Sequence, residues 1–414
     1  ADEEWNIYHT ALWPNFRSKA WSSYFARFNI PEHKIRYMVR PVHALSAPLI
    51  AHELADRETA YAAIERLREI NGGSRLTPTK GRWLRSERQG TGEFEDIQFA
   101  ATPFEAISYV DAFGERADAP AGLALIDLAP IEPVGGPFDV AVDFGTTNTV
   151  ACFDDGEPIK FRDRLVYPLK FANPELSKQE LLGARWLVRK FFPPEMRQTP
   201  TPTVALNRTP FPSQEAHHVF RNVVYFHSHE KHATNEETEE LTKFKQAKFN
   251  LKWTDDSEHA EASTDFLNQF VMMVAAEALA AQKDPRRIRW RFSVPDSLDG
   301  EMRLNFKTNL RDITAKISTE ITDPSDILRE LYSEGLSAAE FILDGGAGFT
   351  RASLNLVLDI GGGTTDITVW DYGPIHWIGS FRLAGQNFFT RTISQNPGIL
   401  APIGLGHWQG LFEF

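Results

Sequence analysis

The sequence has 414 residues, 42% of them apolar and 24% charged, which is an ordinary globular composition with room for two or three domains. A net charge of −12 argues against nucleic acid as a partner, and no apolar run reaches the ~20 residues that a membrane span needs. Cys152 is the only cysteine, so no internal disulfide can form, and we expect a cytoplasmic protein.

Residues 1–137 carry the fewest recognisable patterns. They open with many aromatic side chains, and residues 51–70 have the periodicity of an amphipathic helix. Residues 120–137 are rich in proline and glycine, which is typical of a linker. We therefore predict an N-terminal extension over 1–137, of mixed α/β structure and unknown fold, and regard it as the candidate surface for a protein partner.

From residue 138 onward the pattern becomes that of an α/β domain. Residues 140–142 and 150–153 predict a strand hairpin with its turn at Gly145, and residues 165–262 form an irregular insertion. Residues 264–283 repeat apolar side chains at the helical period, and residues 288–294 alternate as a strand does. A further helix is predicted over about 326–343, then a buried strand over 354–360 and an antiparallel strand over 366–370.

Two segments of this region share one design: VAVDFGTTNTVACFDDG at 140–156 and LVLDIGGGTTDITVWDYG at 356–373. In each, a strand ends in an aspartate, and a glycine and hydroxyl side chains form the turn, so that Asp143 corresponds to Asp359 and Gly145 to Gly361. Turns of this kind present backbone N–H groups to an anion, and a carboxylate at the strand end can hold Mg²⁺ through its waters or orient a water. Glycine-rich turns also occur in ordinary sheets, but two with the same order of residues favour a pair of hairpins that grip one polyphosphate.

The motifs DFGTTNT at 143–149 and DIGGGTTD at 359–366 resemble the phosphate-binding motifs of the actin, heat-shock chaperone and sugar kinase ATPase superfamily. The likeness runs from about residue 138 to 385 and is strongest to the DnaK-type, 70-kDa heat-shock chaperones. It implies an actin-like fold, with two ribonuclease H-like lobes around a nucleotide cleft that binds ATP and Mg²⁺. The sequence lacks the late adenosine-binding motif of that family, so we expect an incomplete second lobe and a chain that is a piece of a longer protein.

The resemblance also implies roles for residues of the two hairpins. Asp143 and Asp359 would hold the waters of Mg²⁺, and Asp366 would align the attacking water. The phosphate contacts fall on Gly145, Thr146, Thr147, Asn148, Gly361, Gly362, Gly363, Thr364 and Thr365.

Two further site residues come from the segments between the hairpins. Glu334 is similar to a glutamate near the metal's waters, at the start of the helix that joins the two lobes. Lys248 is similar to the lysine that stabilises charge on the γ-phosphate, with Lys245 and Lys252 as rivals.

These residues predict a DnaK-like ATPase that binds Mg-ATP between two lobes and couples slow hydrolysis to a conformational switch on a partner protein. The predicted domains are residues 1–137, a first lobe at 138–345 and the start of a second at 346–414. A nucleotide-binding scaffold without hydrolysis, an actin-like filament subunit and a small-molecule kinase remain as alternatives.

Overall fold

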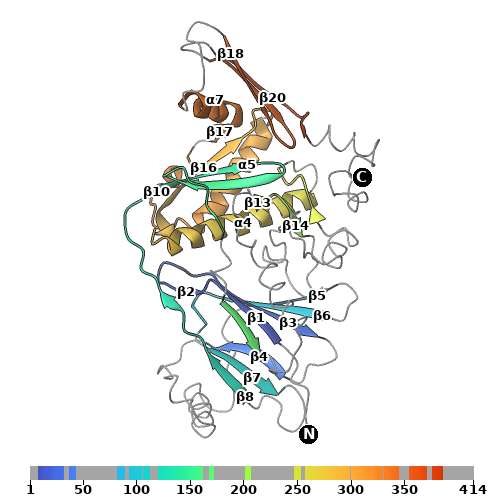
Figure 1. The fold of residues 1–414 in the computed structure, drawn as a ribbon, viewed down its shortest axis with the longest axis vertical. Helices are drawn as coiled ribbons and strands as arrows, with labels where there is room; N and C mark the ends of the chain where they lie inside the picture. Colours follow the sequence, from blue (N-terminus) through green and yellow to red (C-terminus); the bar gives the residue numbers. More distant parts are fainter. Residues whose placement is uncertain are drawn as a thin grey trace, which may run out of the picture. The chain divides into compact units, whose positions relative to one another are not determined.

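The computed structural model describes residues 8–31, 37–42, 82–88, 93–104, 106–111, 120–161, 167–171, 201–206, 247–252, 257–298, 300–329, 331–344, 354–370 and 375–385. These residues belong to two compact units (Figure 1). The first unit comprises residues 1–133, 162–194 and 209–216, and the second comprises 134–161, 195–208 and 217–414. Each unit is considered by itself.

The described part of the first unit is built from β-strands. Its larger sheet has five strands in the order β12 (Tyr167–Phe171), β1 (Tyr8–Trp13), β3 (Tyr24–Pro31), β6 (Glu93–Ala100) and β5 (Arg82–Arg88), all antiparallel. A three-stranded sheet joins β4 (Tyr37–Val42), β7 (Ala106–Asp111) and β8 (Pro120–Leu125), and a parallel pair joins β2 (Phe16–Arg17) to β9 (Ala129–Pro130). The predicted helix over 51–70 lies outside the described residues. The predicted insertion supplies β12 to this unit's sheet.

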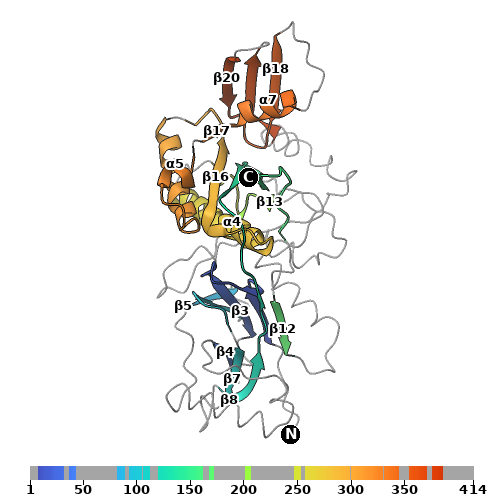
Figure 2. The ribbon, with the colours of Figure 1, turned by 90° about the vertical axis from the view of Figure 1, so that its left-hand side faces the viewer.

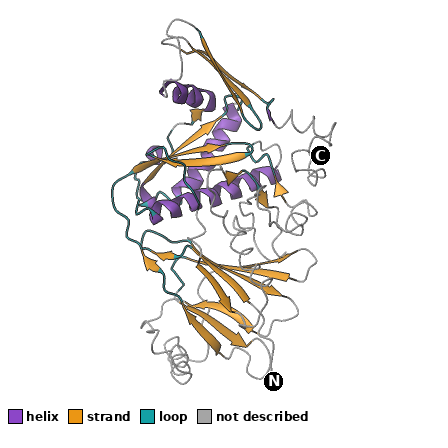
Figure 3. Ribbon diagram, in the orientation of Figure 1, coloured by secondary structure: helices purple, strands orange, loops and turns teal. Residues whose placement is uncertain are grey.

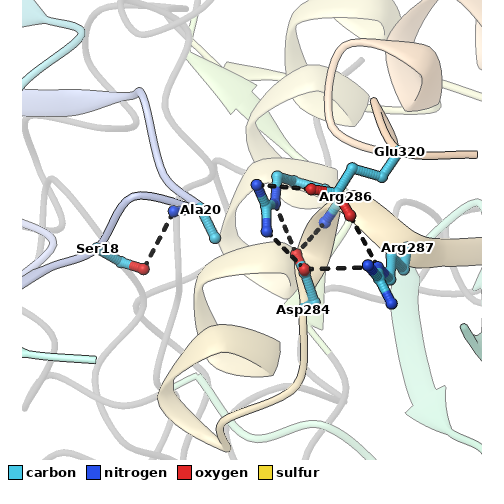
Figure 4. Close-up of polar contacts among 6 residues, drawn as sticks. All are labelled: Ser18, Ala20, Asp284, Arg286, Arg287 and Glu320. Atoms are coloured by element: carbon cyan, nitrogen blue, oxygen red, sulfur yellow. Dashed lines mark hydrogen bonds and ion pairs between the residues drawn. The ribbon is translucent and has the colours of Figure 1, made fainter. Parts of the chain in front are cut away.

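Aromatic side chains form the core of the first unit, as the opening of the sequence suggests. The indole rings of Trp13 and Trp21 meet edge to face at 5.5 Å, and Phe16 meets Trp21 at 5.8 Å. The hydroxyl of Ser18 accepts a hydrogen bond from the backbone N–H of Ala20 (Figure 4), and this bond closes the turn between β2 and Trp21.

The second unit contains a five-stranded sheet in the order β13 (Thr201–Pro202), β11 (Asn148–Phe153), β10 (Phe138–Phe144), β16 (Ile288–Val294) and β17 (Tyr332–Ser333). β11 runs antiparallel to both of its neighbours, β13 and β10, whereas β16 and β17 run parallel to β10. This is the ribonuclease H-like strand order. The predicted hairpin and the predicted strand over 288–294 are its three central strands. The short pair of β14 (Ala205–Leu206) and β15 (Ala247–Lys248) stands apart from this sheet.

Alternation along β10 and β16 separates a buried face from a polar one. Val140, Val142, Trp290 and Phe292 are buried on one face. Helices α4 (Ser257–Ala280) and α5 (Gly300–Ala315) lie beside this sheet (Figure 2). Phe144 links the layers, because its ring stacks on Phe306 of α5 at 5.7 Å and meets Phe266 of α4 at 5.9 Å. The other face carries Asp143 and Ser293 at the ends of their strands.

The helices differ from the prediction in three places. Helix α4 begins at Ser257, seven residues before the predicted start at Thr264, and α5 was not predicted. Only Leu310, Ile313 and Thr314 of α5 are buried, so its sequence has little of the apolar periodicity that marks a helix. The single helix predicted over 326–343 is wrong: α6 (Pro324–Ile327), β17 and α7 (Glu334–Asp344) occupy this stretch.

A network of charged side chains fixes the start of β16 (Figure 4). Asp284 accepts hydrogen bonds from the backbone and guanidinium of Arg286 within the 3-10 turn η5 (Pro285–Arg287). Glu320, beyond α5, pairs with Arg286 at 2.7 Å and with Arg287 at 2.8 Å. These contacts join the entry of β16 to the segment that follows α5.

A second, three-stranded antiparallel sheet in this unit comprises β18 (Asn355–Ile360), β19 (Thr365–Trp370) and β20 (Ile375–Phe381), with α7 against one face (Figure 3). Val357 and Trp370 are buried with Ala339 of α7. The prediction of a fully buried β18 is wrong, because Leu356, Leu358 and Ile360 are 52–63% exposed. The fold is thus α/β with one complete ribonuclease H-like sheet and the antiparallel part of a second, as predicted.

None of the helices in the described part of the chain combines the length and the apolar character needed to cross a bilayer. The domain limits proposed from the sequence remain predictions. The compact units divide the chain at residue 133, and they assign the segments 162–194 and 209–216 to the first unit.

Candidate functional site

The first hairpin places Asp143 at the exposed end of β10. Its Oδ1 accepts a hydrogen bond of 2.8 Å from the hydroxyl of Ser293, its neighbour across the parallel β10–β16 pair. Gly145 then turns the chain so tightly that a Cβ there would overlap the carbonyl oxygen of Asn148. Thr149 of β11 is fully buried, and its hydroxyl bonds Thr203 at 2.7 Å. Because only glycine fits at the turn, the carboxylate and the turn N–H groups stay close together.

The second hairpin repeats this arrangement, and Asp359 is exposed as Asp143 is. Asp359 of β18 and Asp366 of β19 are cross-strand neighbours, and the N–H of Gly361 donates to the carbonyl of Thr364 at 2.9 Å to close the turn. Asp366 is only 2% exposed. Its Oδ1 has no hydrogen-bond partner among the described residues, although hydroxyls of Ser380 and Thr364 bond the same carboxyl group.

The two turns lie against each other. A Cβ on Gly362 would overlap the side chain of Thr147, and one on Gly363 would come within 2.5 to 2.9 Å of Thr146. The structure thus brings together the predicted phosphate-contacting residues of both hairpins, which are more than 200 positions apart in the sequence.

A buried ion pair reaches the same place from two further segments. Lys252, just before α4, contacts Glu334 at the start of α7, and their side chains are only 3% and 12% exposed. Lys248, the first choice from the sequence, is not at this cluster: its Nζ pairs at 2.8 Å with Glu258, which is 69% exposed. The assignment of the lysine therefore moves to Lys252, which the sequence offered only as a rival. A resemblance between short lysine-containing segments could not separate positions four residues apart.

The pKa values of the acidic groups reflect how closely these side chains gather. Burial, and to a smaller extent the charges of Asp143 and Asp366, raise the pKa of Glu334 to about 7, against the opposing charge and hydrogen bond of Lys252. Burial and then the charge of Asp143 raise the pKa of Asp359, which Lys252 opposes. Burial also raises the pKa of Asp366, against hydrogen bonds from Ser380 and Thr364. Four carboxyl groups and one ammonium therefore share a single electrostatic site.

The carboxylates of this site suit a cation that is bound through its water molecules and not by direct contact. Within the described ranges, no group of three or more acidic, histidine or cysteine side chains is arranged to bind a metal directly. Burial and, after it, the charge of Asp143 nevertheless raise the pKa of Asp359, and the buried Oδ1 of Asp366 lacks a hydrogen-bond partner among the described residues. Carboxylates that repel one another in this way are relieved by a hydrated divalent cation, and Mg²⁺ commonly keeps several of its waters.

Other residues support the cluster, and the sequence analysis did not identify them. Gly335, the second residue of α7, lies so close to β19 that a Cβ would come within 2.8 Å of the Thr368 hydroxyl. The hydroxyl of Ser380 of β20 donates to the hydroxyl of Ser297 at 3.1 Å, and Ser380 is the cross-strand neighbour of Asp366. For Ser293 a signal did exist, because alternation along residues 288–294 puts its side chain on the polar face. For Gly335 and Ser380 no sequence pattern pointed to the site.

One complete sheet of ribonuclease H-like order therefore carries the first hairpin, and the second hairpin has the same design and meets it turn to turn. The fold is actin-like.

No protein-family model matches the chain, and no curated protein matches it in sequence. Solved structures similar to this chain include MreB5 of Spiroplasma citri bound to ADP, with 15% identity over 63% of this chain and 58% of that one, and a TM-score of 0.35. Others are a ParM filament from Clostridium botulinum (11% identity, 65% and 71% covered, TM-score 0.32) and an exopolyphosphatase from Cytophaga hutchinsonii (13%, 64% and 61%, TM-score 0.24). The chain matches less than two thirds of the length of MreB5 and of the exopolyphosphatase.

Proposed function

We propose that this protein is an ATPase module that binds Mg-ATP at the meeting point of the two hairpins. One observation carries the proposal: Asp143, Asp359, Asp366, Glu334 and Lys252 converge where two glycine- and threonine-rich turns touch. A nucleoside triphosphate needs N–H donors, a cation and a compact positive charge. The site offers turn N–H groups, carboxylates that would hold a cation, and the ammonium of Lys252.

Each group has a role that its surroundings support. Asp143 and Asp359 would hold the waters of the cation, which would neutralise charge on the phosphates. The turns, including Asn148 and Thr365, place N–H groups and hydroxyls beside the phosphate oxygens. Lys252 stabilises negative charge as the terminal phosphate departs, because a compact ammonium is best suited to that position.

The attacking water is held by the more buried carboxylates. Asp366 has one oxygen bonded by hydroxyls and a second, Oδ1, that can accept a proton from the water. Glu334, with a pKa of about 7, is able to accept or release a proton near neutral pH. Phosphoryl transfer requires mainly positioning and charge stabilisation, so no covalent intermediate is needed.

Two functions could be driven by ATP hydrolysis in this protein: a switch on a partner protein and the assembly of a filament. The GGGTTD turn favours the DnaK-type branch, in which the nucleotide state switches contact with a partner protein, here through residues 1–137. An actin-like filament subunit is favoured by a different observation, namely the exposed apolar side chains on β18–β20. They are Leu356, Leu358, Ile360, Ile375, Trp377 and Phe381. Exposed patches of this kind mark surfaces of association. Light scattering after Mg-ATP is added separates the two, because only a filament subunit gives a rising signal. The single cysteine supports a cytoplasmic setting for either.

The test of the ATPase proposal is nucleotide binding and phosphate release, each with Mg²⁺ and with a chelator. Asp143→Asn and Asp359→Asn should lower the rate of release by roughly a hundredfold or more. Asp155→Asn, at the opposite end of the first hairpin, is the matched control and should keep the rate. Binding without release in the unsubstituted protein would support the non-hydrolysing scaffold, and a phosphorylated small molecule in a substrate screen would support a kinase. No binding of ATP at millimolar concentration would rule the proposal out.

A further inference from the structure

The junction between β17 and α7 is fixed by one serine. Ser333 ends β17, where it lies opposite Val294 of β16, and α7 begins at the next residue, Glu334. The hydroxyl of Ser333 accepts a hydrogen bond of 3.1 Å from the N–H of Leu336, and its carbonyl accepts one of 2.9 Å from the hydroxyl of Ser337. Ser333 is therefore the N-cap of α7, because an N-cap side chain accepts from an N–H group of the first helical turn.

The proton of the same hydroxyl is donated to Asp296. This residue lies in the turn that follows β16, and its Oδ2 accepts the hydrogen bond from Ser333. A serine hydroxyl donates one hydrogen bond and accepts with its lone pairs, so it can donate to Asp296 and accept from Leu336 at the same time. A hydrogen bond to a carboxylate is roughly twice as strong as one between neutral groups. Asp296 therefore fixes the direction in which Ser333 caps the helix.

The next two residues contact two further segments. Glu334 forms its buried ion pair with Lys252, just before α4. Gly335 faces β19, because a Cβ there would lie 2.8 Å from the Thr368 hydroxyl and 3.4 Å from the Cβ of Asp366. The start of α7 thus meets β19 and the segment before α4, while its cap is held by the turn after β16. A displaced cap would move Glu334 relative to both Lys252 and Asp366.

We propose that Ser333 and Asp296 are positioning residues for Glu334: the hydrogen bond between them sets the first turn of α7 so that Glu334 stays at Lys252. The inference rests on the proposed function, because the positions of Glu334 and Lys252 matter most at a site that hydrolyses ATP. Through this bond the first sheet, which carries the first hairpin, also sets a carboxyl group at the start of α7.

The kinetic test compares Ser333→Ala with Ser333→Thr, since threonine keeps the hydroxyl and is also a good N-cap. Ser333→Ala should lower single-turnover hydrolysis at saturating ATP by roughly tenfold, with ATP affinity changed less than about twofold. Ser333→Thr should recover most of the rate. Asp296→Ala should lower the rate to a similar extent. The variant with both alanines should be no slower than the slower single variant, since both residues act through one bond.

The control removes a helix cap elsewhere in the same unit. Asp323 is the N-cap of α6, and its Oδ1 accepts from the N–H of Ser325 at 2.8 Å. Asp323→Ala should lower the midpoint of urea unfolding, as Ser333→Ala does, but it should leave the rate unchanged.

Three kinetic outcomes in an active protein would overturn the proposal. The first is an equal rate for Ser333→Ala and the unsubstituted protein. The second is an equal loss for the alanine and threonine variants, because the hydroxyl would then not matter. The third is a loss in Asp323→Ala that matches the loss in Ser333→Ala, because a general loss of stability would then explain both.

A second measurement does not depend on hydrolysis. With glutamate labelled at its side-chain carboxyl carbon, the Glu334 resonance is identified as the one that Glu334→Gln removes. Asp296→Ala should shift this resonance, whereas Asp323→Ala should not move it. Asp296→Asn, which keeps an oxygen that accepts from Ser333, should leave the resonance nearly in place.

The spectrum separates the inference from the proposed function. If the protein shows no ATPase activity, the proposed function fails, yet the spectrum still decides whether Asp296 sets the position of Glu334. An unmoved resonance in Asp296→Ala would overturn the inference even in an active ATPase. Equal shifts in the alanine and asparagine variants would do the same, because they would mean that the charge of Asp296 acts and its hydrogen bond does not.

Discussion

Lys252 forms a buried ion pair with Glu334 although 82 residues separate them in the sequence. One partner precedes α4 and the other begins α7, so the pair connects the segment that leads into the first sheet's helices to the helix of the second sheet. Its burial makes it sensitive to loss of either partner. The pair of Lys248 and Glu258 is less buried, because these side chains are 20% and 69% exposed.

Replacement of Lys252 should therefore affect both stability and activity. Lys252→Ala leaves the Glu334 carboxyl group buried without its counter-charge. Because the pKa of Glu334 is already about 7, this carboxyl can take up a proton at neutral pH, so we expect a loss of about 1 to 3 kcal/mol in unfolding free energy. Lys252→Met with Glu334→Gln should recover part of the stability but none of the phosphate release. Urea unfolding and single-turnover hydrolysis measure the two effects.

Lys248→Ala is the control for that experiment. Its ion pair is exposed, so unfolding free energy should change by less than about 1 kcal/mol and phosphate release should persist. A large loss of release in Lys248→Ala with little in Lys252→Ala would return the assignment to Lys248.

Stability should depend on pH through Glu334. Its pKa is about 7 in the folded protein against 4.5 for a glutamate side chain in water, so the folded state binds this proton more tightly than the unfolded chain does. The contribution of Glu334 to the unfolding free energy is fully present below pH 4.5. It decreases by about 3 kcal/mol as the pH rises through 7. Urea unfolding in chelator at about pH 5 and pH 8 should show a larger drop in the unsubstituted protein than in Glu334→Gln. Parallel behaviour of the two would contradict the assignment.

The contact between the turns predicts a steric effect with a specific rescue. A methyl group on Gly362 would overlap Thr147, so Gly362→Ala should push the turns apart and weaken ATP binding by roughly tenfold or more. Adding Thr147→Gly should restore part of the affinity, because it removes the side chain that clashes. Gly136→Ala is the control, since a Cβ there meets nothing within 4 Å. Calorimetric titration with Mg-ATP measures all three, and an unchanged affinity in Gly362→Ala would mean that the turns do not bind phosphate together.

The charged network at the start of β16 should stabilise the fold at neutral pH and lose this effect in acid, the reverse of the pH dependence expected for Glu334. Burial opposes ionisation of Asp284, but hydrogen bonds from Arg286 outweigh it and hold the pKa below its usual value. The contribution of Asp284 to the unfolding free energy is therefore present above its pKa in the unfolded chain. This contribution is lost as the pH falls through its lower pKa in the folded protein. Asp284→Ala should cost about 1 to 3 kcal/mol at pH 7, and the difference from the unsubstituted protein should shrink in acid. Thermal or urea unfolding at about pH 7 and pH 3 checks this, and an unchanged difference would contradict it.

The sequence alone was enough for the local features that short-range chemistry controls. Glycine is the only residue that fits the turn at position 145, and alternation along 288–294 predicts a strand with one buried face, because a strand exposes successive side chains to opposite sides. The repeat of an aspartate and a glycine at 143–145 and 359–361 predicted two hairpins of one design. Each of these patterns lies within a few consecutive residues.

Only the tertiary structure decided which distant residues meet. It placed Lys252 beside Glu334, left Lys248 at the exposed Glu258, and divided residues 324–344 into α6, β17 and α7. It also exposed Leu358 on a strand whose apolar sequence predicted burial. These outcomes depend on which segments pack against each other, and packing is set by the path of the whole chain, so no local pattern of residues encodes it.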